Sequence, residues 1–306
     1  MENLLNKVVL ITGASSGIGG YTAKFLSKFK PKLALVARSA DRLKEVQEEC
    51  EMAGCGEGNV ITVTADLAIQ EELPRIISET VDAFGQIDTL VNNAAAFALS
   101  DVEHTKSDTF DRLIAVNLCA PFFLSQHAMP HLKKTKGSVI NISSMAAHRP
   151  IPDVAAYCIS KRGLEHFTKL LALEMAGHGV RANAVIPGGT MTDTDEEWLQ
   201  LGLPDLSMQL SEVERTQPLG GSCSMQDIAS VIGFLASDLA NAMTGACLPV
   251  DRGALVMPSI QPQVVSEQMV EMKNMGDFNI VPTELRLQQL AELIKAGAHG
   301  PSSSSL

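Results

Sequence analysis

Seven short runs of apolar and β-branched residues alternate with longer amphipathic stretches along most of the chain. Each run is apolar almost throughout, which is typical of strands that are buried on both faces. This alternation predicts an α/β fold with a doubly wound parallel sheet that is covered by helices on both sides. The predicted strands are residues 7–12, 32–37, 59–64, 87–92, 137–143, 180–186 and 246–250, and the predicted helices include 41–50, 71–84, 109–132 and 157–177.

The alternating pattern stops near Pro258. We therefore predict a single domain over residues 1–258 and a C-terminal extension over residues 259–306. Thr283 is placed to cap one last helix over residues 284–296, whose apolar residues fall on a single face. The serine-rich end of the chain is expected to be disordered. The last helix could pack on the core, pack on a partner subunit, or remain a loosely attached tail.

The chain is acidic, with 24 Lys and Arg residues against 35 Asp and Glu residues and a net charge of −11. Such a surface repels the phosphates of nucleic acids and anionic lipids, so neither is an expected partner. No apolar run reaches the ~18 residues that a membrane helix needs, and the N-terminus lacks the pattern of a secretory leader. Six cysteines are scattered without the spacing of a disulfide framework or a metal site. We therefore expect free thiols, no metal, no membrane span and a cytoplasmic location.

A glycine-rich loop follows the first predicted strand and leads into a helix. Gly13 permits the tight turn, Gly17 lets the backbone approach a pyrophosphate, and Gly19 allows the helix to pack closely on the strand. The helix N-terminus adds free N–H groups and a partial positive charge for the phosphates. This context predicts a dinucleotide site rather than a plain structural turn. The loop is Thr12-Gly13-Ala14-Ser15-Ser16-Gly17-Ile18-Gly19, and the expected cofactor contacts in it are Gly13, Ser15, Ser16, Gly17, Ile18 and Gly19.

The ends of the second and third predicted strands bear on the choice of dinucleotide. A site for NAD usually carries an acid after the second strand, but this chain has Arg38 there. A guanidinium pairs with a 2′-phosphate that an acid would repel, so Arg38 favours NADP(H), with NAD(H) as the second possibility. Asp66, after the third strand, is placed to accept a hydrogen bond from the adenine amino group. The alternatives are a solvated charge for Arg38 and a simple helix cap for Asp66.

Tyr157 and Lys161 are four residues apart in a predicted helix, so they share one face. A free tyrosine has a pKa of about 10, and a nearby ammonium lowers it by favouring the phenolate. Ser144 follows the fifth predicted strand, at the edge where such sheets bind ligands, and could donate to a substrate oxygen while Tyr157 transfers the proton. Asn117 lies in an apolar helical stretch and needs partners. It could bind backbone and a water leading from Lys161, or be purely structural.

These residues together resemble the short-chain dehydrogenase/reductase family, in its non-extended branch, over roughly residues 5–258. The motifs that carry the resemblance, in order, are the glycine loop, Asp66, Asn92-Asn93-Ala94, Asn117, Ser144, Tyr157-Cys158-Ile159-Ser160-Lys161 and Pro187-Gly188. The resemblance implies a seven-stranded Rossmann fold. It also implies a catalytic tetrad in which Tyr157 is the acid and base, and Lys161 lowers the pKa of Tyr157 and binds the nicotinamide ribose. Ser144 would steady the carbonyl oxygen and Asn117 would hold a proton-relay water.

The resemblance also implies further cofactor contacts, and the sequence departs from the family at two positions. The additional contacts are Leu67, Asn93, Ala94, Pro187, Gly188 and Thr192. Ala95 stands where the family usually has glycine, and its methyl group could crowd the cofactor ribose or merely shift the strand end. Arg252 also replaces a glycine, near the last strand, and could alter a turn or a subunit contact.

The segment between Pro187 and the helix near Gln226 is apolar and resembles the family's lid over the substrate. It favours a hydrophobic or amphipathic substrate. We expect Trp198 from this segment to line the pocket together with Met145 and His148, although Trp198 could instead pack on the body of the protein.

The predicted helices 109–132 and 157–177 resemble the pair that forms the family's dimer contact, which implies a homotetramer or, second, a homodimer. The sequence thus predicts an NADP(H)-dependent oxidoreductase that interconverts a carbonyl and a secondary alcohol by hydride transfer, similar to the 3-oxoacyl-carrier-protein reductases. The alternative is a catalytically silent dinucleotide-binding regulator or scaffold.

Overall fold

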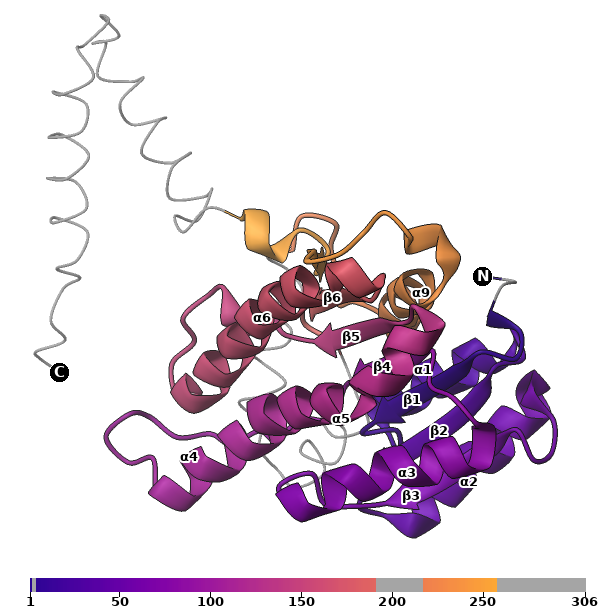
Figure 1. The fold of residues 1–306 in the computed structure, drawn as a ribbon. Helices are drawn as coiled ribbons and strands as arrows, with labels where there is room; N and C mark the ends of the chain where they lie inside the picture. The colour runs from indigo at the N-terminus through magenta and orange to yellow at the C-terminus, as the bar shows by residue number, and fades with distance from the viewer. Residues whose placement is uncertain (2–3, 191–216, 258–306) are drawn as a thin grey trace, which may run out of the picture. The chain divides into compact units, whose positions relative to one another are not determined.

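A seven-stranded parallel sheet forms the centre of the part of the chain that the computed structural model describes, which is residues 1, 4–190 and 217–257 (Figure 1). The strand order is β3-β2-β1-β4-β5-β6-β7, and every neighbouring pair is parallel. The predicted doubly wound Rossmann sheet is therefore confirmed. The strands are β1 (Val8–Thr12), β2 (Lys32–Ala37), β3 (Val60–Thr64), β4 (Thr89–Asn92), β5 (Ser138–Ile142), β6 (Arg181–Pro187) and β7 (Cys247–Val250).

The helices lie where the amphipathic stretches predict them, with one difference. The predicted helix 109–132 is interrupted by a π-helical turn, η4 (Ala115–Cys119). Such a turn contains one residue more than a turn of α-helix, and π-helical turns are frequent at functional sites. The apolar spacing continues through η4, so it does not distinguish this turn from α-helix. The α-helices are α1 (Gly17–Ser27), α2 (Ala40–Cys50), α3 (Leu73–Phe84), α4 (Ser107–Ile114), α5 (Ala120–Thr135), α6 (Ala155–Met175) and α9 (Met225–Ala236).

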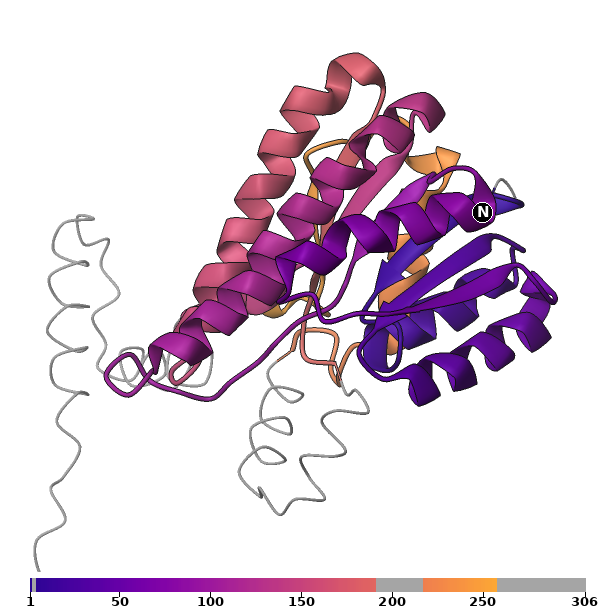
Figure 2. The ribbon, with the colours of Figure 1, turned by 60° about the horizontal axis from the view of Figure 1, so that its bottom comes forward.

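Each face of the sheet has its own apolar layer, because successive side chains of a strand point to opposite faces. In β1, Val9 and Ile11 pack into the cluster that includes residues of α1, α2 and α9. Leu10, between them, belongs to the cluster that includes residues of α3, α5 and α6. Figure 2 shows the two helical layers with the sheet between them. Burial on both faces explains why the strands are apolar almost throughout.

The order of the strands determines where a ligand can bind. β1 lies between β2 and β4, so the chain crosses from one half of the sheet to the other between β3 and β4. The loops that leave β1 and β4 turn to opposite faces, and such a point leaves a crevice at the carboxyl ends of the strands.

Some predictions concern residues outside the described part of the chain. These are the lid segment with Thr192 and Trp198, and the extension 259–306 with its helix 284–296. Among the described residues, no helix has both the length and the apolar character needed to cross a membrane.

Candidate active site

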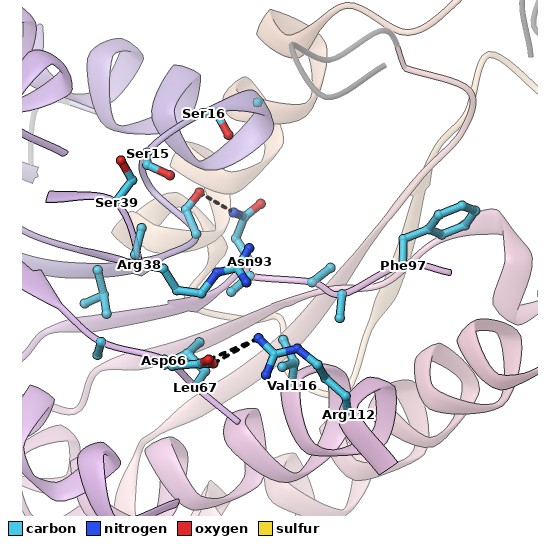
Figure 3. A pocket seen from close by; sticks show the side chains of 18 of the residues that line it. Ser15, Ser16, Arg38, Ser39, Asp66, Leu67, Asn93, Phe97, Arg112 and Val116 are labelled. Carbon is cyan, nitrogen blue, oxygen red and sulfur yellow. Dashed lines mark hydrogen bonds and ion pairs between the residues drawn. The ribbon is translucent and has the colours of Figure 1, made fainter. Parts of the chain in front are cut away.

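A cavity of about 760 Å³ lies at the carboxyl ends of β1 to β4 (Figure 3). It occupies the crevice that the strand order predicts. Its lining includes most of the cofactor contacts expected from the sequence, namely Gly13, Ser15, Ser16, Gly17, Ile18, Arg38, Asp66, Leu67, Asn93 and Ala94. The structure therefore brings together residues from four segments that are well separated in the sequence.

The glycine loop packs so tightly that a side chain at Gly13 or Gly19 would clash with its neighbours. Gly13 has a φ of +67°, which favours glycine, and a Cβ on Gly19 would lie 2.3 Å from the Gly13 carbonyl oxygen. Asn93 fixes the loop from the end of β4, because its Nδ2 donates to the backbone oxygens of Thr12 (2.9 Å) and Gly13 (3.2 Å). The loop then leads into α1, whose cap residue Ser16 makes no side-chain bond to the helix. The start of a helix carries a partial positive charge, which favours anions such as phosphates.

Three arginines line the end of the cavity near β2 and β3. Arg38 follows β2 at the predicted place, Arg42 lies on α2 and Arg112 lies on α4. Figure 3 shows Arg38 extending into the cavity and Arg112 reaching Asp66. Sequence reasoning missed two of them. Arg42 could have been found from its position in the first turn after the Ser39 cap, whereas nothing in the sequence pattern singled out Arg112.

Asp66 is ionised, and its carboxylate already accepts hydrogen bonds from other residues of the protein. Its carboxylate accepts hydrogen bonds from Arg112 Nη2 (3.1 Å) and from the Ala68 backbone N–H (3.0 Å). Burial raises the pKa of Asp66, but these two hydrogen bonds and the charges of Arg112 and Arg38 outweigh it, so the pKa lies below its ordinary value. A carboxylate in this state only accepts hydrogen bonds, which suits the amino group of adenine. The adenine contact stays a prediction.

Tyr157 and Lys161 meet on one face of α6, as their spacing predicts. Lys161 Nζ lies 5.7 Å from the centre of the Tyr157 ring and donates to the Ile142 carbonyl oxygen at the end of β5 (2.8 Å). The lysine is 2% exposed, and this burial lowers its pKa from 10.5 to about 8. A buried amine beside a phenol is an arrangement suited to proton transfer.

Ser144 and Asn117 lie on two other elements. Ser144 caps the short 3-10 helix η5 (Met145–Ala147), and its Oγ accepts from the Ala146 backbone N–H (3.2 Å). Asn117 is fully buried in η4. Its Oδ1 accepts from the Ala96 N–H (2.7 Å) and its Nδ2 donates to the Ala96 oxygen (2.9 Å). The backbone contact predicted for this asparagine is thus confirmed, while its relay water stays a prediction.

The surroundings of Tyr157 contain one residue that sequence reasoning missed. The ring of Phe97 meets Tyr157 edge to face, with centroids 5.2 Å apart, and Phe97 is 45% exposed. Met145 is half-buried beside Ser144. The predicted substrate residue His148 has its Nε2 directed at the buried Glu165 carboxylate (2.9 Å), so its role toward a substrate stays a prediction.

The two departures from the family pattern lie in different places. Ala95 lines the cavity between Ala94 and Ala96. Arg252 has a φ of +51°, the left-handed conformation in which glycine is common. Its guanidinium donates to the carbonyl oxygens of Leu219 (3.2 Å) and Gly220, so it fixes a turn near the last strand. Near it, the Gly188 N–H donates to the Val250 carbonyl oxygen (2.9 Å). This hydrogen bond holds the Pro187-Gly188 segment, which the sequence predicts to contact the cofactor, against β7.

Comparison with known proteins agrees with this geometry. The family model described as enoyl-(acyl carrier protein) reductase matches residues 13–254. A meso-2,3-butanediol dehydrogenase of Serratia marcescens is 32% identical, over 85% of this chain and 98% of that protein. A 3-oxoacyl-(acyl-carrier-protein) reductase of Rickettsia prowazekii is 33% identical, over 84% of this chain and 100% of that protein.

The solved structures give the same result. A double mutant of a Serratia marcescens short-chain dehydrogenase/reductase superposes with a TM-score of 0.76 at 31% identity, over 83% of this chain and 99% of that one. The chain therefore belongs to the short-chain dehydrogenase/reductase family and is an oxidoreductase that acts on CH–OH groups.

Proposed function

We propose that this protein is an NADP(H)-dependent enzyme that interconverts a carbonyl group and a secondary alcohol by hydride transfer, with Tyr157 as acid and base. The observation that carries the proposal is the position of Lys161. Its buried Nζ lies 5.7 Å from the centre of the Tyr157 ring, where little water screens its charge. An ammonium in that place favours the phenolate form of the tyrosine. The related dehydrogenases and reductases argue against the silent regulator that the sequence left open.

The tetrad would then divide the proton chemistry among its members. A bound nicotinamide supplies or accepts the hydride. Tyr157 would give its proton to the carbonyl oxygen during reduction and take it back during oxidation. Ser144 would donate its hydroxyl hydrogen to the same oxygen, while its Oγ accepts from the Ala146 N–H. Lys161 would bind the ribose, and Asn117 would hold the water through which the proton leaves.

The residues of the cavity suit a dinucleotide with a 2′-phosphate. The tight glycine loop and the start of α1 would hold the pyrophosphate, and Asp66 and Leu67 would border the adenine. Arg38 and Arg42 would face the 2′-phosphate, since both line the cavity beyond β2. The predicted contacts at Pro187, Gly188 and Thr192 would border the nicotinamide.

Changing Arg38 to aspartate is expected to invert the preference for the cofactor. The Kd for NADPH should rise about tenfold or more, because a guanidinium partner of the phosphate is replaced by a repelling charge. The Kd for NADH should change much less. The control is Lys44→Asp, the same charge change at an exposed position of α2 that does not line the cavity. Isothermal titration with both cofactors measures the effect, and an unchanged preference would refute the NADP(H) assignment.

The substrate that fits this site is hydrophobic or amphipathic. Phe97 places an aromatic ring, 45% exposed, next to the catalytic phenol. The test is a panel of short polar and larger apolar ketones with NADPH or NADH. Turnover is measured as the loss of the absorbance of the reduced cofactor. We expect turnover that is faster, as kcat/KM, for the apolar ketones. Absence of turnover across the panel with either cofactor would refute the proposed function.

We also propose that the enzyme is a homotetramer, or second a homodimer, that pairs through α5 and α6. Exposed apolar side chains on these helices support this, namely Phe122 (44% exposed), Leu170 (46%) and Leu173 (77%). Light scattering should give four or two times the chain mass of 32.7 kDa, and a monomer would contradict the proposal. The six free cysteines support a location in the reducing cytoplasm.

A further inference from the structure

Glu165 places a buried carboxylate next to the segment that carries Ser144. It lies on α6, and its side chain is 2% exposed. Its Oε1 accepts a hydrogen bond from Ser143 Oγ (2.8 Å), and its Oε2 lies 2.9 Å from His148 Nε2. Arg162 Nη1 adds a third contact, to Oε2 at 3.2 Å. The proton chemistry described above makes no use of this carboxylate.

Two partners of Glu165 bracket Ser144 along the chain. Ser143 comes directly before it, and His148 follows the 3-10 helix η5 (Met145–Ala147) that Ser144 caps. One turn of 3-10 helix has few hydrogen bonds of its own, so its direction depends on what holds its ends. The carboxylate ties both ends of this segment to α6, the helix that also carries the catalytic tyrosine and lysine.

Ser143 connects the same carboxylate to the surroundings of Lys161. Its Oγ lies 3.4 Å from the Lys161 carbonyl oxygen, and Lys161 Nζ donates to the Ile142 oxygen directly before Ser143 (2.8 Å). The end of β5 is therefore held to α6 by an ammonium and a carboxylate one helical turn apart. These contacts fix the position of Ser144 relative to Lys161.

Stability alone does not account for a charge in this position. Moving a carboxylate out of water is costly, and apolar residues of similar volume often stabilise a fold equally well. A charge-assisted hydrogen bond is shorter and stronger than a neutral one, so the carboxylate contributes a more sharply fixed geometry. Active sites depend on such support, because a misplacement of about 1 Å can cost about a hundredfold in rate.

We propose that Glu165 is a positioning residue that holds the Ser144 hydroxyl in its productive place through Ser143 and His148. The proposal rests on the proposed function of Ser144 toward the substrate oxygen. It assigns no contact with the substrate or the cofactor to Glu165 itself. Its loss should therefore weaken the chemical step and leave binding largely unchanged.

The test compares Glu165→Gln with Glu174→Gln, a matched control at an exposed position of the same helix. Glutamine keeps the side-chain length and one acceptor oxygen but loses the charge. For Glu165→Gln we expect kcat to fall about tenfold or more, while KM and the Kd for NADPH stay within about twofold of wild type. The control should keep the wild-type kcat. A purely structural role would lower the melting temperature without this division between kcat and KM.

Ser143→Ala provides a second, independent measurement. If Ser143 and Glu165 act as a unit, the double variant should lose about as much kcat as Glu165→Gln alone. A wild-type kcat in Glu165→Gln, or losses that multiply in the double variant, would overturn the inference. Wild-type turnover, measured in the same assay, reports separately on the proposed function. If Glu165→Gln does not fold, Ser143→Ala and His148→Gln replace it, and a wild-type kcat in both overturns the inference.

Discussion

Tyr157→Phe is expected to reduce kcat about a thousandfold while the protein stays folded. Phenylalanine lacks the hydroxyl through which the proton moves, and general acid–base catalysis contributes about 10²–10⁴ to a rate. The ring itself should keep its edge-to-face contact with Phe97, so the apolar wall of the pocket remains. Consequently KM for the ketone and Kd for NADPH should change little. Initial rates at saturating ketone and NADPH measure the loss.

The second tyrosine of the chain provides the control. Tyr21 is half-buried on α1, away from the tetrad, so Tyr21→Phe should retain full activity. Turnover of Tyr157→Phe at the wild-type rate would show that another group moves the proton, and the enzyme's mechanism would have to be assigned anew.

Lys161→Met is expected to abolish most of the activity and, separately, to change how stability depends on pH. The loss in kcat should be on the order of a hundredfold or more, because the ammonium that favours the Tyr157 phenolate is gone. Burial lowers the pKa of Lys161 from 10.5 in the unfolded chain to about 8 in the folded protein. Between these two values the unfolded state binds more protons than the folded state, so the stability of the wild type rises with pH there.

The methionine variant lacks this titration, since its side chain carries no proton to lose. The free energy of unfolding of the wild type should therefore rise relative to that of the variant by roughly 3 kcal/mol as the pH increases from 8 to 10.5. Urea unfolding at several pH values measures the difference. Lys169→Met, at an exposed position of α6, should follow the wild type. Parallel curves for the wild type and Lys161→Met would show that the buried lysine is not the titrating group.

The pattern of apolar residues was sufficient to predict the sheet. Its strands are buried on both faces, and a run such as β2 is therefore recognisable without knowledge of its neighbours. The same holds for motifs that lie within one element or one loop. Tyr157 and Lys161 are one helical turn apart, and the glycine loop depends on local backbone conformation, so the sequence contains most of what is needed to place them.

Contacts between distant segments could not be predicted in this way. Arg112 meets Asp66 from a helix 46 residues further along the chain, and neither residue has a spacing that indicates the pair. Glu165 resembles an ordinary helical glutamate until Ser143 and His148 are placed against it. In each case the partner is determined by how the chain crosses the sheet. Patterns of neighbouring residues in the sequence contain no information on that crossing.

The π-helical turn η4 limits how the chain can vary in length. A π-helical turn contains one residue more than the α-helix around it, so removing one residue between α4 and α5 would take away that insertion and leave the two helices in register. Regular α-helix could form through the shortened stretch, but Asn117 would then point away from Ala96 and Ser160. Single-residue deletions here should spare folding more than catalysis, so the length of this stretch is under chemical constraint in addition to the identity of Asn117.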